Sequence, residues 1–104
     1  MTDDIPNARA RRLGIITLAL SFPTLHDAPG VNPWDPERLA AWAKSSASSG
    51  GRHAAAFVLG VYSRTLPAAL GLPFDMHAAV EMWDEEHLTA FQAWAADPWR
   101  LWLG

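Results

Sequence analysis

The sequence contains no cysteine among its 104 residues. A disulfide framework, a zinc site with thiolate ligands and a cysteine nucleophile are therefore excluded. Lysine is almost as scarce, because Lys44 stands alone beside seven arginines scattered along the chain. Binding to nucleic acid requires a stripe of positive charge that neutralises many phosphates. Because the sequence shows no such stripe, we expect no direct nucleic-acid ligand.

A long apolar segment is also lacking. The longest apolar run, Leu13 to Leu20, has less than half of the ~20 residues that a helix needs to cross a bilayer. Three arginines in residues 9–12 precede this run, as in a secretory signal, but Asp3 and Asp4 in the same basic region argue against export. We therefore expect no membrane partner, and a cytoplasmic location, which the absence of cysteine also fits.

Charge is divided unevenly along the chain, whose formal net charge is −3. Residues 73–104 hold one base, Arg100, and six acids: Asp75, Glu81, Asp84, Glu85, Glu86 and Asp97. The earlier part is mildly basic. Half of the residues are apolar and 18% are charged, which is typical of one small globular domain.

The first third of the chain shows few helix signals. Residues 1–12 are polar and indicate an arm, while Leu13 to Phe22 contain β-branched residues and stop at Pro23, which predicts a short strand or an extended segment. With no second strand to pair with, this segment packs on a helical bundle as a helix or an extended arm, pairs with a copy of itself in a dimer, or stays disordered. We favour packing on the bundle. Proline and glycine then predict a loop up to Pro36, so we assign residues 1–33 to an N-terminal arm and loop.

Residues 34–104 predict a helical domain. Asp35 and Pro36 form a strong helix start, since the carboxylate caps free amides and proline suits the first helical position. That helix ends at a serine and glycine linker, Ser45 to Gly51. Residues 52–62 are apolar nearly all round, which predicts a central helix.

Two further helix starts follow a turn region over residues 64–73. Asp75 predicts a cap for a short helix that runs to Glu81 or Met82, and Asp84 predicts another that runs to Ala96. The sequence therefore predicts an all-α fold: a small four-helix domain with an irregular or short-strand N-terminal segment.

A pattern in the second half of the chain resembles short uncharacterised bacterial and phage-borne proteins. It consists of His53-Ala54-Ala55-x-Phe57-Val58-Leu59-x-Val61-Tyr62 and then Phe74-Asp75-x-His77-x-Ala79-Val80-x-x-Trp83-Asp84-x-x-His87-x-x-Ala90-Phe91-x-x-Trp94-Ala95-x-Asp97-Pro98-Trp99. The resemblance implies a compact helical domain of unknown activity and transfers no catalytic residue. The stretch before Trp34 has no counterpart in it.

The sharpest chemical candidate is a metal site built on His77, Glu81 and His87. His77 and Glu81 are four residues apart, so in one continuous helix they share a face and could share a metal. A helix break at Asp84 would spoil this alignment, and the simpler interpretation makes Asp84 a cap. The sequence also lacks a nucleophile elbow and a phosphate-binding loop. We expect no cofactor and no catalytic residue, and keep a metal-dependent enzyme as an alternative.

The tryptophans point to binding. There are six: Trp34, Trp42, Trp83, Trp94, Trp99 and Trp102. Trp42, Trp83 and Trp94 lie on the apolar faces of predicted helices and are expected in the core. Trp99 and Trp102 follow the last helix, so they either cap the bundle or form an aromatic anchor for a partner.

These observations favour a small, non-enzymatic protein that works by contacting another protein. The predicted contact residues are Trp99, Trp102 and the acidic residues Glu81, Glu85 and Glu86, which would suit a basic partner surface. Such a chain could be an accessory subunit or a host-directed inhibitor from a phage. The alternative is a self-associating homodimer completed by Leu13 to Phe22 or by the C-terminal tail.

Overall fold

A computed structural model describes residues 4–96, and its side chains from residue 9. The elements are α1 (Asp4–Leu20), the 3₁₀ helix η1 (Pro23–Leu25), α2 (Pro36–Ser45), α3 (Ser49–Tyr62), α4 (Leu66–Ala69), α5 (Met76–Met82) and α6 (Glu85–Ala96). Residues 4–96 contain no strand, so the all-α prediction is confirmed, with six α-helices where four were expected. Each helix in this range is too short or too polar to traverse a bilayer.

The N-terminal segment forms the helix α1, so the predictions of an arm over residues 4–12 and of a strand or extended segment at Leu13 to Phe22 are wrong. The favoured alternative, in which this segment packs on the bundle, holds with the segment as a helix against α3. Ile15, Leu18, Ala19 and Phe22 are all buried. Their spacing of three, four and seven residues is that of one face of a helix. The β-branched residues in this segment favour a strand only weakly, and burial of the helical face overrides that preference. Near its middle, α1 is joined to the end of α3 by Arg11, whose guanidinium donates to the Tyr62 carbonyl oxygen at 2.8 Å.

The helix starts at Asp35 and Asp75 are confirmed. Each carboxylate accepts a hydrogen bond from the backbone N–H three residues ahead, at 3.2 Å in both cases. The predicted linker from Ser45 to Gly51 is mostly helical instead, because α2 includes Ser45 and α3 begins at Ser49. Ser48 caps α3 by accepting from the Gly51 N–H at 3.2 Å. The short helix α4 lies within residues 64–73, where the sequence predicts a turn region.

The loop before α2 closes tightly on that helix. Gly30 has a φ of +91°, and a Cβ added there would lie 2.5 Å from the Leu39 nitrogen and 2.6 Å from the Asp35 oxygen. Only glycine fits this close approach. The Asp35 N–H donates to the Gly30 carbonyl oxygen at 2.7 Å, which fixes the loop against the start of α2.

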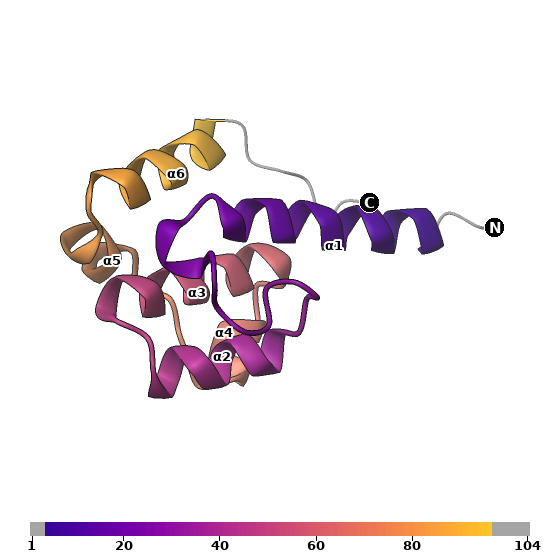
Figure 1. Cartoon of the computed structure of the whole chain (residues 1–104), viewed down its shortest axis with the longest axis horizontal. Helices are drawn as coiled ribbons and strands as arrows, with labels where there is room; N and C mark the ends of the chain where they lie inside the picture. The colour runs from indigo at the N-terminus through magenta and orange to yellow at the C-terminus, as the bar shows by residue number, and fades with distance from the viewer. Residues whose placement is uncertain (1–3, 97–104) are drawn as a thin grey trace.

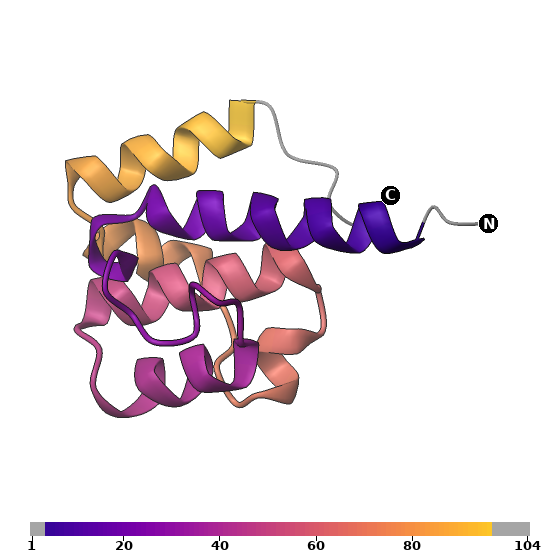
Figure 2. The ribbon, with the colours of Figure 1, turned by 45° about the vertical axis from the view of Figure 1, so that its right-hand side comes forward.

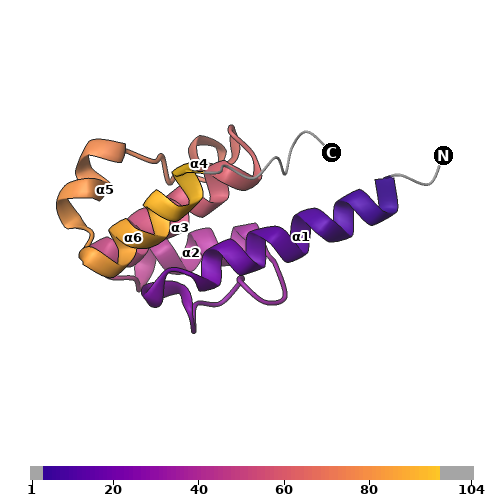
Figure 3. The same cartoon turned by 90° about the horizontal axis from the view of Figure 1, so that it is seen from above.

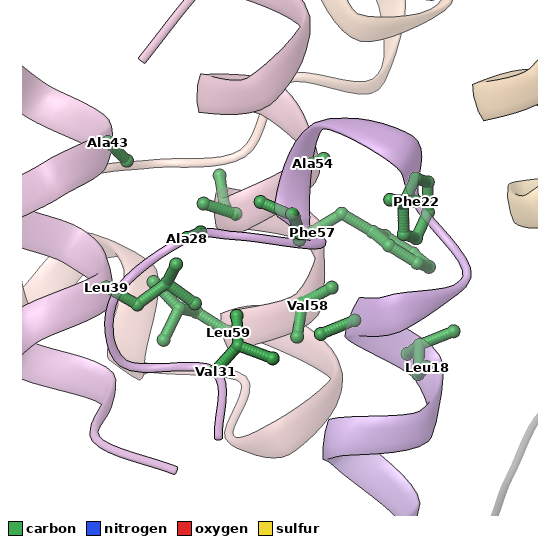
Figure 4. Close-up of a cluster of buried hydrophobic side chains, with 14 of the residues drawn as sticks. Leu18, Phe22, Ala28, Val31, Leu39, Ala43, Ala54, Phe57, Val58 and Leu59 are labelled. Atoms are coloured by element: carbon green, nitrogen blue, oxygen red, sulfur yellow. The ribbon is translucent and has the colours of Figure 1, made fainter. Parts of the chain in front are cut away.

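Helix α3 lies in the middle of the molecule, between α1 and α2 (Figures 1 and 2). Its residues 54–59 are all buried, as expected for a helix that is apolar nearly all round. Figure 4 shows Phe57, Val58 and Leu59 among side chains from α1, α2 and the loop between them. Seen from above, α5 lies at one end of the molecule and α6 runs back from it across α3 (Figure 3).

Phe57 is the centre of an aromatic cluster that joins α3 to the rest of the chain. The distances between its ring centroid and those of its partners are 5.7 Å to Phe22, 5.5 Å to Phe74, 6.2 Å to Trp83, 5.2 Å to Phe91 and 5.1 Å to Trp94. The pairs with Phe91 and Trp94 are edge-on, with interplanar angles of 70° and 86°, which is a favoured geometry for aromatic rings. One buried side chain of α3 thus contacts rings from the segment after α1, from both sides of α5 and from α6.

Replacing Phe57 with alanine is expected to lower the free energy of unfolding by about 3–5 kcal/mol, through lost burial and the cavity that remains. Phe57→Leu, which keeps most of the apolar volume, should cost clearly less. Urea denaturation of both variants measures the difference. Equal, small losses for the two substitutions would show that the cluster does not depend on this ring.

Candidate functional site

An apolar groove lies between α3, α4, α5 and α6. Its volume is about 670 Å³. The lining residues are Phe57, Gly60, Val61, Arg64, Pro67, Ala68, Pro73, Phe74, Met76, Phe91, Trp94 and Ala95. Phe57, Val61 and Pro67 are buried, whereas Arg64, Ala68, Pro73, Met76 and Ala95 are exposed. The groove therefore has a buried floor and a rim that is open to solvent.

Small residues and large rings together create the groove. Gly60 faces α4, and a Cβ added to it would lie 3.5 Å from Pro67, so glycine leaves space between α3 and α4. On the opposite wall, α6 contacts α3 through the rings of Phe91 and Trp94. Such large side chains hold the two helix backbones apart, so that space remains beside them.

Arg64 is the charged side chain at the rim of the groove. Among the described residues that line the groove it is the only charged one, and none has a carboxylate, hydroxyl or amide side chain. The Trp94 Nε1 is buried and has no hydrogen-bond partner within residues 9–96. Of the described lining side chains, Arg64 is therefore the one that offers hydrogen-bond donors to an occupant, and none offers an oxygen acceptor.

A second polar cluster joins the start of α6 to η1. The Thr24 hydroxyl lies 2.8 Å from His87 Nε2, and His87 Nδ1 lies 2.7 Å from Asp84 Oδ1. The His87 residue is only 4% exposed, and its ring stacks on Trp83 with 6.3 Å between ring centroids. Because a carboxylate can only accept, His87 Nδ1 donates to Asp84, and in that tautomer Nε2 is the atom that accepts a hydrogen bond from the Thr24 hydroxyl.

The order hydroxyl, imidazole, carboxylate is that of a hydrolase triad, but the contacts of Asp84 identify a structural role. Asp84 Oδ1 also accepts the backbone N–H of His87 at 3.0 Å, and the Asp84 carbonyl accepts the N–H of Leu88 at 3.0 Å. These are the contacts of a helix cap. The pKa of Asp84 is held below its ordinary value, first by the hydrogen bond from the His87 side chain and to a smaller extent by that from the His87 backbone N–H. The cluster therefore fixes the beginning of α6.

The acidic residues predicted as contacts lie outside the groove. Glu81 on α5 and Glu85 and Glu86 on α6 are all exposed. Glu85 and Glu86 line a different depression of about 540 Å³ between α6 and the η1 region, together with His26. Glu81 is not among the residues that line it. The other predicted contacts, Trp99 and Trp102, lie outside the described residues.

The metal site considered for His77, Glu81 and His87 does not form. His77 and Glu81 are exposed, whereas both ring nitrogens of His87 contact Thr24 and Asp84. Within the described part of the chain, no three acidic or histidine side chains are grouped as metal ligands. The alternative of a metal-dependent enzyme at these residues is therefore not supported.

The tryptophans expected in the core lie there to different degrees. Trp83 is 5% exposed, and its Nε1 donates to the Gly50 carbonyl oxygen at 3.1 Å. Trp42 and Trp94 are half-buried and pack against the core. The groove and its rim residue Arg64 were not predicted from the sequence. The one available signal was Gly60, a small residue in the apolar run of α3 and four positions before Arg64.

Comparisons with protein-family models, with characterised proteins and with solved structures find no match to this chain. The resemblance of the second half to short bacterial and phage-borne proteins stays a prediction.

Substitution of Thr24 by valine tests the structural role of the second cluster. It removes the hydroxyl while keeping the shape, and leaves His87 Nε2 buried without its partner, so the free energy of unfolding should fall by about 1–3 kcal/mol. Thr24→Ser should retain most of the stability. Thr89→Val, at an exposed position of α6, serves as the control in urea denaturation. If Thr24→Val cost no more than Thr89→Val, the hydrogen bond would not hold α6.

Proposed function

We propose that this protein is a non-enzymatic interaction module that binds an amphipathic helix of another protein in the groove between α3 and α6. The observation that supports this function is an open apolar groove walled by aromatic rings. Aromatic residues and arginine are the types that dominate protein interfaces, and Phe74, Phe91, Trp94 and Arg64 all line the groove. Helix-in-groove binding uses this kind of surface.

The shape of the groove favours a polypeptide over a small molecule. Pockets for small ligands usually enclose 70–90% of the ligand surface. Here the rim residues Arg64, Ala68, Met76 and Ala95 are exposed, so one side of any occupant stays in contact with solvent. An amphipathic helix suits such a site because it buries one apolar face and keeps its polar face in water.

Two further features extend the proposed contact surface. Glu81, Glu85 and Glu86 are exposed and would attract a basic region of the partner, which mainly affects the association rate. Trp99 and Trp102 follow the groove-lining residues of α6 in the sequence and would add apolar contact. A module of this kind would serve as an accessory subunit or as a host-directed inhibitor from a phage.

The groove is tested by filling it. Helical peptides that bind the intact protein are selected from a displayed library, and the dissociation constant of a synthetic copy is measured by fluorescence anisotropy. Ala68→Trp places a large side chain at the exposed rim, so we expect binding to weaken by about 10-fold or more, which corresponds to the loss of one anchor contact. Circular dichroism checks that the variant is folded.

The matched control is Ala41→Trp, which adds the same side chain at an exposed position of α2 that does not line the groove. It should leave the dissociation constant unchanged. Equal binding to the wild-type protein and to the Ala68→Trp variant would refute the groove as the binding site.

A homodimer is the second candidate. Leu13 and Leu20, two turns apart on α1, are 59% and 38% exposed. They form an apolar edge that a second copy would cover. The mass of the protein in solution distinguishes this candidate from a monomeric module.

A further inference from the structure

Arg64 lies at the rim of the groove, just after Ser63 ends α3. Its side chain is exposed, and it makes no hydrogen bond or ion pair with residues 9–96. The described acids nearest in sequence, Asp75 and Glu81, are not among the lining residues, and neither are Glu85 and Glu86. Among the described side chains that line the groove, Arg64 therefore offers hydrogen-bond donors at the rim, and none offers an oxygen that accepts a hydrogen bond.

We propose that the partner helix carries an acidic side chain that pairs with Arg64, so that the groove selects apolar helices bearing a carboxylate. This inference rests on the proposed function and specifies the chemistry of its partner. An arginine guanidinium binds a carboxylate through two parallel hydrogen bonds, which adds geometric specificity to the charge attraction.

The apolar walls strengthen this preference. An occupant that covers Phe74, Phe91 and Trp94 displaces water from the groove, and the interaction between opposite charges grows as the local dielectric falls. An occupant without a hydrogen-bond acceptor would displace water from the Arg64 guanidinium without replacing the hydrogen bonds of that water, which weakens binding. A basic side chain at the same place would be repelled. Arg64 therefore discriminates among apolar helices that the walls alone would bind equally.

The test changes the charge at the contact both on the peptide and at Arg64 of the protein. A selected peptide is synthesised with its acidic residue, with the corresponding amide, and with lysine at that position. On the wild-type protein, the amide peptide should bind about 10-fold more weakly than the acid peptide and the lysine peptide more weakly still. Arg64→Ala should remove the difference between acid and amide, and Arg64→Glu should reverse the order so that the lysine peptide binds best.

Arg52→Glu is the control, because Arg52 is an exposed arginine of α3 that does not line the groove; it lines a neighbouring depression with His53 and Leu72. It should leave the ranking of the three peptides unchanged. Raising the salt concentration should reduce the difference in dissociation constant between the acid and amide peptides on the wild-type protein. On Arg64→Ala the two dissociation constants should be equal at every salt concentration.

The failures of the two proposals are distinguishable. Equal binding of acid and amide peptides to the wild-type protein, with binding still lost in Ala68→Trp, would overturn the role of Arg64 and leave the groove as the binding site. Binding that is insensitive to Ala68→Trp would overturn the proposed function itself. Binding of laurate, a free long-chain carboxylate, is measured as a third comparison. If the selection yields no peptide, and laurate binds to the wild-type protein but not to Arg64→Ala, the ligand of the groove is a free long-chain carboxylate and the proposed helix is refuted.

Discussion

The packing of five aromatic rings around Phe57 is the interaction on which the rest of the structure depends. Helix α3 occupies the centre of the molecule because its residues are apolar on nearly every side. Its small residues Ala54 and Ala55 are fully buried. Phe57 reaches beyond its own helix to the ring of Phe22 between α1 and η1, to that of Trp83 after α5, and to that of Phe91 on α6.

The two ends of α6 are held by different kinds of interaction. Its beginning is fixed by directional hydrogen bonds, from Thr24 to His87 and from His87 to Asp84, and by the Trp83 indole bound to Gly50. The second half is held by the rings of Phe91 and Trp94 against Phe57. Aromatic contacts keep the helix in place while holding its backbone away from α3. The groove is the space that results, so the stability of α6 and the groove have the same physical origin.

The parts of the fold that local chemistry determines could be predicted from the sequence. Asp35 and Asp75 were identified as caps because the spacing between a cap and the amide it binds is fixed within one turn. The helix at α1 was missed because β-branched residues suggested a strand, and only burial against α3 decides between the two. Gly51 was assigned to a linker. It lies instead in the first turn of α3, where its N–H donates to the Ser48 cap and where the Trp42 ring would lie 3.3 Å from an added Cβ.

The candidate site was less predictable, for the same reason. A groove depends on how α3, α4, α5 and α6 meet, and no single segment carries a pattern for it. The acidic residues Glu81, Glu85 and Glu86 were expected as one contact face, but their place relative to η1 follows from the cap at Asp84 and the hydrogen bond to Thr24. Arg64 became a candidate only when its apolar surroundings were known.

Backbone hydrogen exchange measured residue by residue by NMR tests the central claim most directly, namely that α6 is held to α3 by side-chain rings and anchored at its beginning. The account predicts that amides of α3 around Val58 and Leu59 exchange only through global unfolding. Amides in the second half of α6, from Phe91 to Ala96, should exchange faster through local opening, and should slow down when a helical peptide fills the groove. Equal protection of α3 and the end of α6, unchanged by the peptide, would contradict the account.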